Sequence, residues 1–419
     1  MAMPVTFVYS YAKVNATREM PMTAKVPPRT PQTGSGVVLE LIRSGAATTR
    51  SALIEHLGWS RVTLAKRLDE LLEAGLILQS GQEHSGGGRP ASSFAVAKDA
   101  GLLLAMDIGS SHTRVGITDL ISTVLCEDEA DIGLFDGPDD IFSWALQVFE
   151  HLLRTIGRSF DEVRGIGIGV PGPVDVTSGT LGSPQLDPRW DDVRVRDYLG
   201  RLPEDIVITV DRDANILAVG ESRLAWREHR DLVVVKAGIG VGCALVLDGR
   251  VYRGGRGGAG QLSAPLRTGL SDPLRRLETV ASGGTVREGL ARGQDRDGIR
   301  VRTSADIVRL VEQGDAEAIA AVEAVGEVIG YAIADVVGII NPTAVVVGGN
   351  LAEAGDRFIA AIRQAVFRAS HAFARQGLVV ERARLGMRAG VRGASLLAQD
   401  ALFDSDRIST LTRSSAGRA

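Results

Sequence analysis

Three glycine-rich stretches of this sequence are candidates for phosphate chemistry. Each comes directly after an apolar run that reads as a strand, and the first also carries a carboxylate and a hydroxyl. Glycine-rich turns after strands can bring backbone amides close to phosphate oxygens, and three such turns are far more specific than one. The residues that would line them are Asp107, Gly109 and Thr113, then Gly238 and Gly240, then Gly348 and Gly349. A competing interpretation is that these glycines only shape tight turns, and we favour it over nucleotide binding.

A second candidate chemistry is DNA recognition near the start of the chain. From Arg50 to Ile77 the apolar residues recur at three- and four-residue steps, with Gly58 between two predicted helices. These proportions are typical of a helix-turn-helix, whose last helix enters the major groove. Its outward residues would be Ser60, Arg61, Thr63, Lys66 and Arg67. The alternative is a solvated helical hairpin with basic residues that only face water.

A glycine-rich segment that follows this helix predicts a wing. Two extended arms flank the tip GGGRP, so Arg89 is a candidate for minor-groove contact, although a loop arginine is also commonly just solvated.

Charge is divided unevenly along the chain. The 419 residues carry a formal net charge of −4, but residues 1–99 have 11 Lys and Arg against 8 Asp and Glu, while the remainder is acidic. The basic front favours a nucleic-acid partner. Two distant cysteines exclude a disulfide framework, and no apolar run reaches membrane-spanning length, so we expect a cytoplasmic protein.

The elements that must position these residues divide the chain into four parts. We expect a disordered leader at 1–34, which holds five prolines, and a winged helix-turn-helix at 35–97. Strands and helices then alternate over 98–403, which predicts an α/β body of two lobes. The Ser-, Thr- and Arg-rich end at 404–419 predicts a frayed, disordered tail.

Several longer motifs give the body a family resemblance. They are GVPGPVD at Gly169–Asp175, GIGVG at Gly238–Gly242, RGGRGGAG at Arg253–Gly260, LETVASG at Leu277–Gly283 and VVVGGNLAEAG at Val345–Gly355. In these the chain resembles the ROK family of repressors, open reading frames and kinases. The resemblance implies an actin-like ATPase fold of the sugar-kinase and ribonuclease H-like type. A winged helix in front of such a body looks like the repressor branch.

The family's catalytic residues are only partly present. The resemblance places Asp213 at the position of the base that takes a proton from the sugar hydroxyl. Arg212 stands where the family has Asn, and we expect this cation to pair with Asp213 and make it a poorer base. Gln185 replaces a sugar-contacting Asn, and Gln261 to Ala264 replace the family's Glu-x-Gly-His. Ser110, Ser111 and Ala237 alter the phosphate loops as well, so we expect no kinase activity and no cofactor.

The family's structural zinc is also expected to be absent. The three cysteine positions of the resemblance fall on Gly269, Ser271 and Arg276, none of which offers a thiolate. Zinc sites of this type need Cys and His ligands, so we predict no metal.

The remaining residues of the central cleft predict an effector site. Amides, a cation and carboxylates are available there to bind a sugar or sugar derivative, from Gln185, Arg212, Asp213, Gln261 and Glu278. If Arg212 contacts the ligand, we expect the ligand to carry an acidic group. The sequence thus predicts a homo-oligomeric repressor of carbohydrate-related genes that binds an operator and a sugar effector. Two alternatives stay open: an ATP-dependent sugar kinase with an added DNA-binding domain, and a regulator whose body only dimerises.

Overall fold

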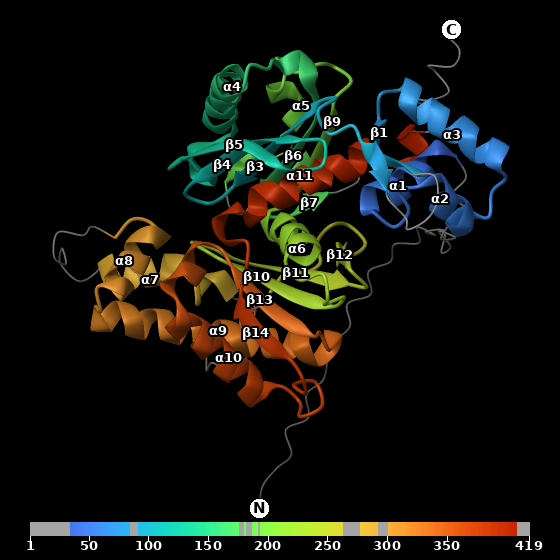
Figure 1. Ribbon diagram of the computed structural model, residues 1–419. Coiled ribbons are helices and arrows are strands. Elements are labelled where there is room, and N and C mark those ends of the chain that lie inside the picture. Colours follow the sequence, from blue (N-terminus) through green and yellow to red (C-terminus); the bar gives the residue numbers. More distant parts are fainter. Residues whose placement is uncertain are drawn as a thin grey trace, which may run out of the picture. The chain divides into compact units, whose positions relative to one another are not determined.

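The computed structural model describes residues 34–83, 91–175, 180–181, 187–191, 193–262, 277–291 and 301–408 (Figure 1). Among these, no helix is both long and apolar enough to cross a membrane. The tip of the predicted wing, Gln185, and the positions compared with zinc ligands lie outside the described residues, as does the side chain of Glu278.

The first described domain is a three-helix unit followed by a hairpin. Its helices are α1 (Ser35–Ser44), α2 (Arg50–Leu57) and α3 (Arg61–Glu73), and β1 (Ile77–Glu83) pairs antiparallel with β2 (Ala91–Val96). The Thr49 side chain caps α2 by accepting from the Ala52 amide, and the turn into α3 passes through Gly58 in the left-handed region. Such caps satisfy amides that the first turn of a helix leaves without partners. The three helices and the hairpin that the sequence predicts are therefore present.

The body contains two five-stranded sheets with the same strand order. The first sheet has the strand order β5-β4-β3-β6-β9. Its strands are β3 (Leu102–Ile108), β4 (Thr113–Asp119), β5 (Val124–Ala130), β6 (Val163–Val170) and β9 (Val207–Arg212). The second runs β12-β11-β10-β13-β14, from β10 (Leu232–Ala237), β11 (Val241–Leu247), β12 (Arg250–Tyr252), β13 (Ala344–Gly348) and β14 (Val379–Arg382). In each sheet the first three strands are antiparallel and the last two join in parallel. The topology therefore occurs twice.

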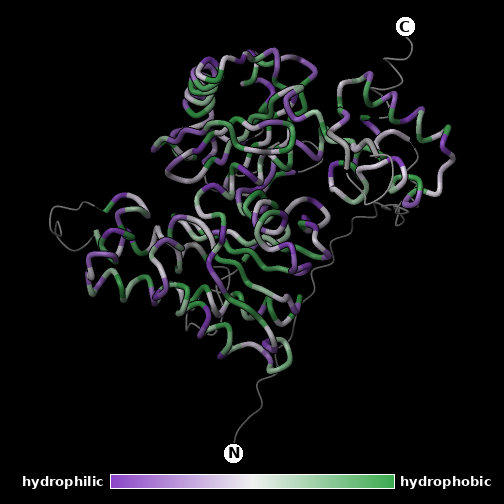
Figure 2. Tube along the Cα trace, in the orientation of Figure 1, coloured by the Kyte–Doolittle hydropathy of each residue, from purple (hydrophilic) through white to green (hydrophobic). Residues whose placement is uncertain are grey.

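Helices cover both sheets because alternate strand residues point to opposite faces. Even-numbered β3 residues such as Leu104 share a core with α4 (Pro138–Thr155), whereas Ala105 packs with α6 (Asp213–Leu224) and α11 (Ala389–Leu402). In the second sheet, Val233 and Val235 face α9 (Ala316–Ile340) and α10 (Asp356–Ala369), and the apolar strands stand out in Figure 2. Val234 packs with α6 on the other face. Helix α6 thus packs against both sheets, and α11 packs beside it against the first sheet.

Smaller elements complete the described body. They are α5 (Val195–Tyr198), α7 (Gly283–Ala291), α8 (Ser304–Glu312) and the short pair β7 (Val174–Asp175) and β8 (Thr180–Leu181). The expected alternation of strands and helices is confirmed as an α/β body. The sequence pattern did not predict β5 because its residues are largely half-exposed or exposed, which leaves only weak hydrophobic alternation.

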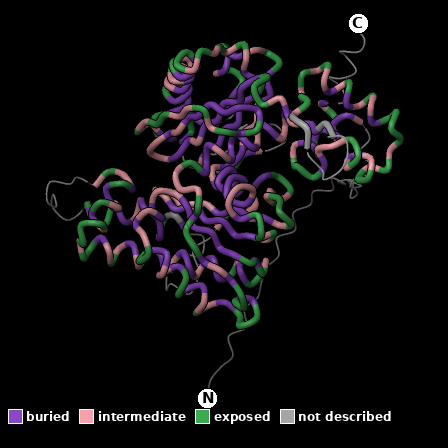
Figure 3. The backbone as a smooth tube through the Cα atoms, viewed as in Figure 1, coloured by how far each residue is buried: buried purple, intermediate pink, exposed green. Residues whose placement is uncertain are grey.

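The three-helix unit with its hairpin, called the winged domain from here on, shares one hydrophobic cluster with the body. Val38, Leu68 and Phe94 of the winged domain are buried in one cluster with Leu402 and Ile408 of the body. Figure 3 shows buried segments in both parts of the chain. The disordered tail expected at 404–419 does not describe its first residues, because residues 405–408 form a helical turn and Ile408 has no exposed surface. The rest of that range, 409–419, lies outside the described residues. Burial of this apolar side chain explains why the chain stays ordered past Asp404.

Candidate functional site

Helix α3 presents a polar face to solvent. Its N-cap Ser60 accepts a hydrogen bond from the Thr63 amide over 3.1 Å. The buried stripe consists of Leu64, Leu68 and Leu71. Arg61, Thr63 and Lys66 are exposed, so the first two turns carry cations and a hydroxyl outward.

Arg67 belongs to a different environment from the other predicted contacts. Its guanidinium lies 2.9 Å from the Glu70 carboxylate, and Glu70 also accepts a hydrogen bond from Ser35 of α1. Burial raises the pKa of Glu70, but the hydrogen bonds from Ser35 and Arg67 outweigh it and keep this pKa below its usual value. Arg67 therefore takes part in a contact between α3 and α1.

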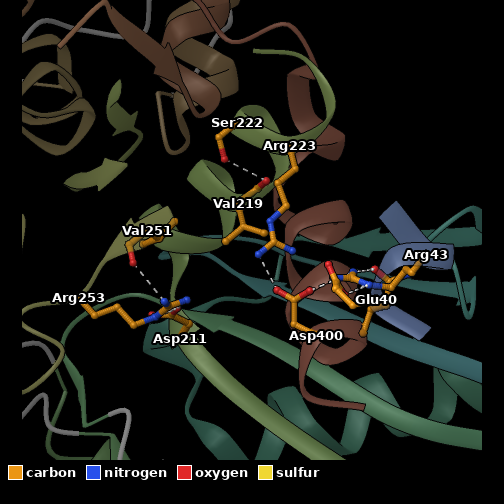
Figure 4. Close-up of polar contacts among 10 residues, drawn as sticks. Glu40, Arg43, Asp211, Val219, Ser222, Arg223, Val251, Arg253 and Asp400 are labelled. Atoms are coloured by element: carbon orange, nitrogen blue, oxygen red, sulfur yellow. Dashed lines mark hydrogen bonds and ion pairs between the residues drawn. The ribbon is translucent and has the colours of Figure 1, made fainter. Parts of the chain in front are cut away.

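A polar network ties α1 to the end of α11 (Figure 4). The Asp400 carboxylate lies 3.2 Å from Nη1 of Arg43 and 2.6 Å from Nη2 of Arg223, which is at the end of α6. Arg43 also donates to Gln399 Oε1 over 2.9 Å, and Gln399 Nε2 donates to the Leu120 carbonyl. One carboxylate thus contacts cations from the winged domain and from the body.

A charged cluster, defined here as Asp107, Lys236 and Asp213, joins the carboxyl end of β3 to β10 and the start of α6. Lys236 Nζ lies 2.9 Å from Asp107 Oδ1 and 3.3 Å from Asp213 Oδ2. The three side chains are only 12–19% exposed. Burial lowers the pKa of Lys236, but the two carboxylates outweigh that effect and raise it above its ordinary value. The lysine therefore stays charged and serves as counterion to both aspartates.

The expected Arg212–Asp213 ion pair is wrong. Arg212 is the last residue of β9, its side chain is buried, and its guanidinium donates to the Ala259 carbonyl. Asp213 begins α6 and faces Lys236 instead. The chain changes from strand to helix between the two residues, so neighbours in sequence point in different directions.

The loop that accepts the Arg212 hydrogen bond is tightly packed. A Cβ on Gly260 would lie 2.1 Å from the Cys243 carbonyl oxygen, which leaves room there only for glycine.

A second ion pair, in which the carboxylate of Asp211 is buried, stabilises the end of β9. Asp211 accepts from Arg253 over 2.8 Å, from Asn215 over 2.7 Å and from the Arg212 amide over 2.8 Å. These bonds fix the strand end from which Asp213 projects. Gln261, another predicted effector contact, is exposed two residues after Ala259.

The glycine loops are occupied by internal hydrogen bonds. The Gly109 amide donates to the His112 carbonyl over 2.8 Å, and the Thr113 hydroxyl donates to the Ile132 carbonyl over 2.7 Å. In the second loop the Gly238 amide donates to Gly240, and the Gly238 carbonyl accepts from Gly283. The third loop contains Gly349 at φ +89°, where a Cβ would lie 2.4 Å from the Ala237 carbonyl oxygen, and Gly348 is buried beside it. Turn geometry thus accounts for several of these glycines.

Sequence reasoning missed Lys236 and Asp400. A lysine in the apolar run VVVKA is a signal for a buried cation, but the sequence does not identify Asp107, 129 residues away, as its partner. Asp400 carried no signal beyond being acidic on an amphipathic helix. Among the described residues, no group of three or more His, Cys, Asp or Glu side chains is arranged to hold a metal ion.

Comparison with known proteins shows which proteins this chain resembles. The pattern of the ROK family matches residues 103–401. A xylose repressor of Caldicellulosiruptor bescii is 25% identical over 373 residues, covering 85% of this chain and 93% of the relative. A glucokinase of Halalkalibacterium halodurans is 27% identical over 314 residues, covering 70% of this chain and 94% of the relative.

The solved structures agree with the fold. A crystal structure titled as a ROK family transcriptional regulator, homologous to the E. coli MLC protein, superposes with a TM-score of 0.71 at 24% identity, covering 91% of this chain and 99% of that one. Because the family pattern spans most of the chain and the two-sheet body has the same fold as that regulator, the chain belongs to the ROK family.

Proposed function

We propose that this protein is a sequence-specific DNA-binding regulator, acting as a repressor, whose body binds a sugar or sugar derivative and thereby controls DNA binding. The observation that carries the proposal is the capped helix α3, with Arg61, Thr63 and Lys66 exposed, in a domain whose core continues into the body. The likeness to a xylose repressor, which includes most of this chain, supports it. We place its action in the bacterial cytoplasm, on genes of carbohydrate metabolism.

The roles of the α3 residues follow from their positions. Residues at the start of a recognition helix reach base edges, so Arg61 and Lys66 contact guanine or phosphate oxygens. Ser60 and Thr63 form the cap and direct backbone amides towards phosphate. Arg67 and Arg89 act at the edges of this surface, Arg89 from the wing. Two copies of the chain bind a palindromic operator, because a two-fold dimer presents two such helices.

The route between effector and DNA runs along α6 and α11. Asp213 begins α6, and Asp107 lies against the start of α11, where a Cβ on Gly390 would be 1.9 Å from its Oδ2. At the far ends, the Asp400 carboxylate of α11 contacts both Arg223 of α6 and Arg43 of α1. A helix rises 1.5 Å per residue, so the ten residues from Gly390 to Asp400 span about 15 Å. Ligand contact at Asp213 shifts these packed helices and with them the winged domain.

The effector is a polyhydroxylated molecule, and its binding does not require an acidic group on it. Gln185, Gln261, Glu278 and Asp213 contact its hydroxyls in this proposal. Arg212 has its guanidinium on the Ala259 carbonyl, so its contribution is to hold the loop rather than to meet an anion. The charged cluster holds two carboxylates and one ammonium, a net negative charge that disfavours a phosphate ester.

We propose further that the body does not transfer phosphate and needs no cofactor. A general base must be free to accept a proton from the sugar hydroxyl. Asp213 lies 3.3 Å from the ammonium of Lys236, which it shares with Asp107, so its carboxylate is already engaged in an ion pair. The Thr113 hydroxyl and the Gly109 and Gly238 amides are likewise engaged within the chain.

A sugar kinase is the second candidate function. The retained Asp213 and the likeness to a glucokinase favour it. A coupled ATP-consumption assay over a panel of sugars separates the two candidates. We expect no turnover; turnover that disappears in Asp213→Ala would establish the kinase and contradict this proposal.

Selection from a random duplex pool tests the regulator directly. The purified full-length protein should enrich a two-fold symmetric sequence, and sugars should then be screened for the ability to release it. Enrichment of no sequence would exclude DNA recognition. If the protein selects a specific operator but no sugar changes its binding, the body acts only as a dimerisation scaffold. Thermal-shift measurements with the same sugars would check that result.

A further inference from the structure

Val62 is an exposed valine in the middle of the proposed DNA surface. Its side chain is 80% exposed, whereas Leu64 and Leu68 on the same helix are at most 1% exposed. Single exposed apolar residues are common and need no explanation by themselves. Val62, however, lies between Arg61 and Thr63 in the first turn, and Lys66 is one turn further on the same face.

Val62 is the exposed apolar side chain of this turn, because its exposed neighbours are polar. Arg61 and Lys66 are cations, and the Thr63 hydroxyl lies 2.9 Å from the Ser60 hydroxyl within the cap. A valine has no hydrogen-bonding group, and its branched β-carbon makes it a poorer helix former than alanine or leucine. Neither packing nor helix propensity therefore favours valine at this exposed position.

The major groove offers one apolar feature at this scale. Each thymine carries a C5-methyl group there, next to hydrogen-bonding edges and the phosphates that attract cations. The first residues of a recognition helix are the ones that reach base edges. The isopropyl group of Val62, between the cations of Arg61 and Lys66, is therefore complementary to a thymine methyl group that lies among hydrogen-bond acceptors and phosphates.

We propose that Val62 contacts the C5-methyl group of one thymine in each operator half-site and so sets base preference there. This inference rests on the proposed DNA-binding function and adds to it the identity of one base. Loss of a buried methyl group corresponds to about fourfold in affinity. The contact is therefore measurable although it is weaker than a bidentate arginine–guanine pair.

Thymine-to-uracil replacement tests the contact without changing base pairing. In the selected operator, each thymine of one half-site is replaced by deoxyuridine in turn, and the Kd is measured for wild type and for Val62→Ala. At one position we expect uracil to weaken wild type about fourfold and to leave Val62→Ala unchanged. Leu125→Ala, which alters a 46% exposed leucine on β5, is the matched control and should keep the full uracil effect.

The outcomes separate this inference from the proposed function. If wild type binds its operator specifically but Val62→Ala retains every uracil effect, the Val62 contact is wrong and DNA binding stands. If wild type prefers no duplex at all, the proposed function fails first and the contact with it. Thermal unfolding of Val62→Ala should match wild type because the side chain is exposed.

Discussion

The carboxylate of Asp400 lies 3.2 Å from the guanidinium of Arg43, which joins the last helix of the body to the first helix of the winged domain. The same carboxylate lies 2.6 Å from Arg223 at the end of α6. Half-buried ion pairs of this kind contribute on the order of 1 kcal/mol. The contact therefore affects how firmly α1 is held.

Asp400→Asn should loosen α1 without unfolding the body. Removal of the shared negative charge leaves Arg43 paired with Glu40 within α1 over 2.7 Å but without its ion pair to the body. We therefore expect amide hydrogen exchange in α1 to accelerate about fivefold, which corresponds to about 1 kcal/mol. Glu353→Gln is the matched control, because Glu353 pairs with Arg382 over 3.2 Å within the body. Unchanged exchange in Asp400→Asn, or equal acceleration in both variants, would show that this ion pair does not hold α1.

Lys236→Met should destabilise the body strongly. The substitution keeps a long unbranched side chain but leaves Asp107 and Asp213 without their counterion in a largely buried place. Loss of one partner from such a cluster costs about 3 kcal/mol in the free energy of unfolding, measured by urea titration.

Neutralising a carboxylate should restore part of that loss. The double variant Asp107→Asn with Lys236→Met is expected to recover at least about 1 kcal/mol, because less unpaired charge remains buried. Lys98→Met, at an exposed lysine, should change stability by less than about 0.5 kcal/mol. Additive losses in the double variant would mean that Lys236 stabilises the protein by packing rather than by charge.

Acid should weaken the protein through His112. Burial lowers the pKa of His112 below its ordinary value of 6.5, with Lys236 and Arg114 acting in the same direction and Asp107 opposing them. The unfolded chain then binds a proton that the folded chain does not. Stability is thus full above pH 6.5 and falls as pH decreases from 6.5 towards the folded-state pKa.

Replacing the ring isolates this contribution. The free energy of unfolding of His112→Gln should change less between pH 7.5 and 5.5 than that of wild type. His151→Gln, which alters an exposed ring on α4, should follow the wild-type curve. A His112→Gln curve with the wild-type slope would contradict the assignment.

The sequence predicts what local patterns control. Apolar residues at helical spacing on both sides of Gly58 were enough to predict α2 and α3, and the apolar runs placed most central strands. Local patterns do not say which distant residues meet. Lys236 on β10 reaches Asp107 on β3 although the two strands belong to different sheets. Arg212 points away from its neighbour Asp213 because a strand becomes a helix between them. Ile408 stayed ordered because of a core it shares with the winged domain, a contact that its polar surroundings in sequence conceal.

Binding of the selected operator by an Arg61→Ala, Lys66→Ala double variant tests the central claim most directly. Each side chain that contacts a base or phosphate is worth about 1 to 3 kcal/mol, so we expect the Kd to rise at least about 30-fold at constant salt. Arg357→Ala, at a 62% exposed arginine on α10, should bind like wild type, and all three proteins should have the same oligomeric state. Wild-type affinity in the double variant would contradict the assignment of α3 as the DNA-reading helix.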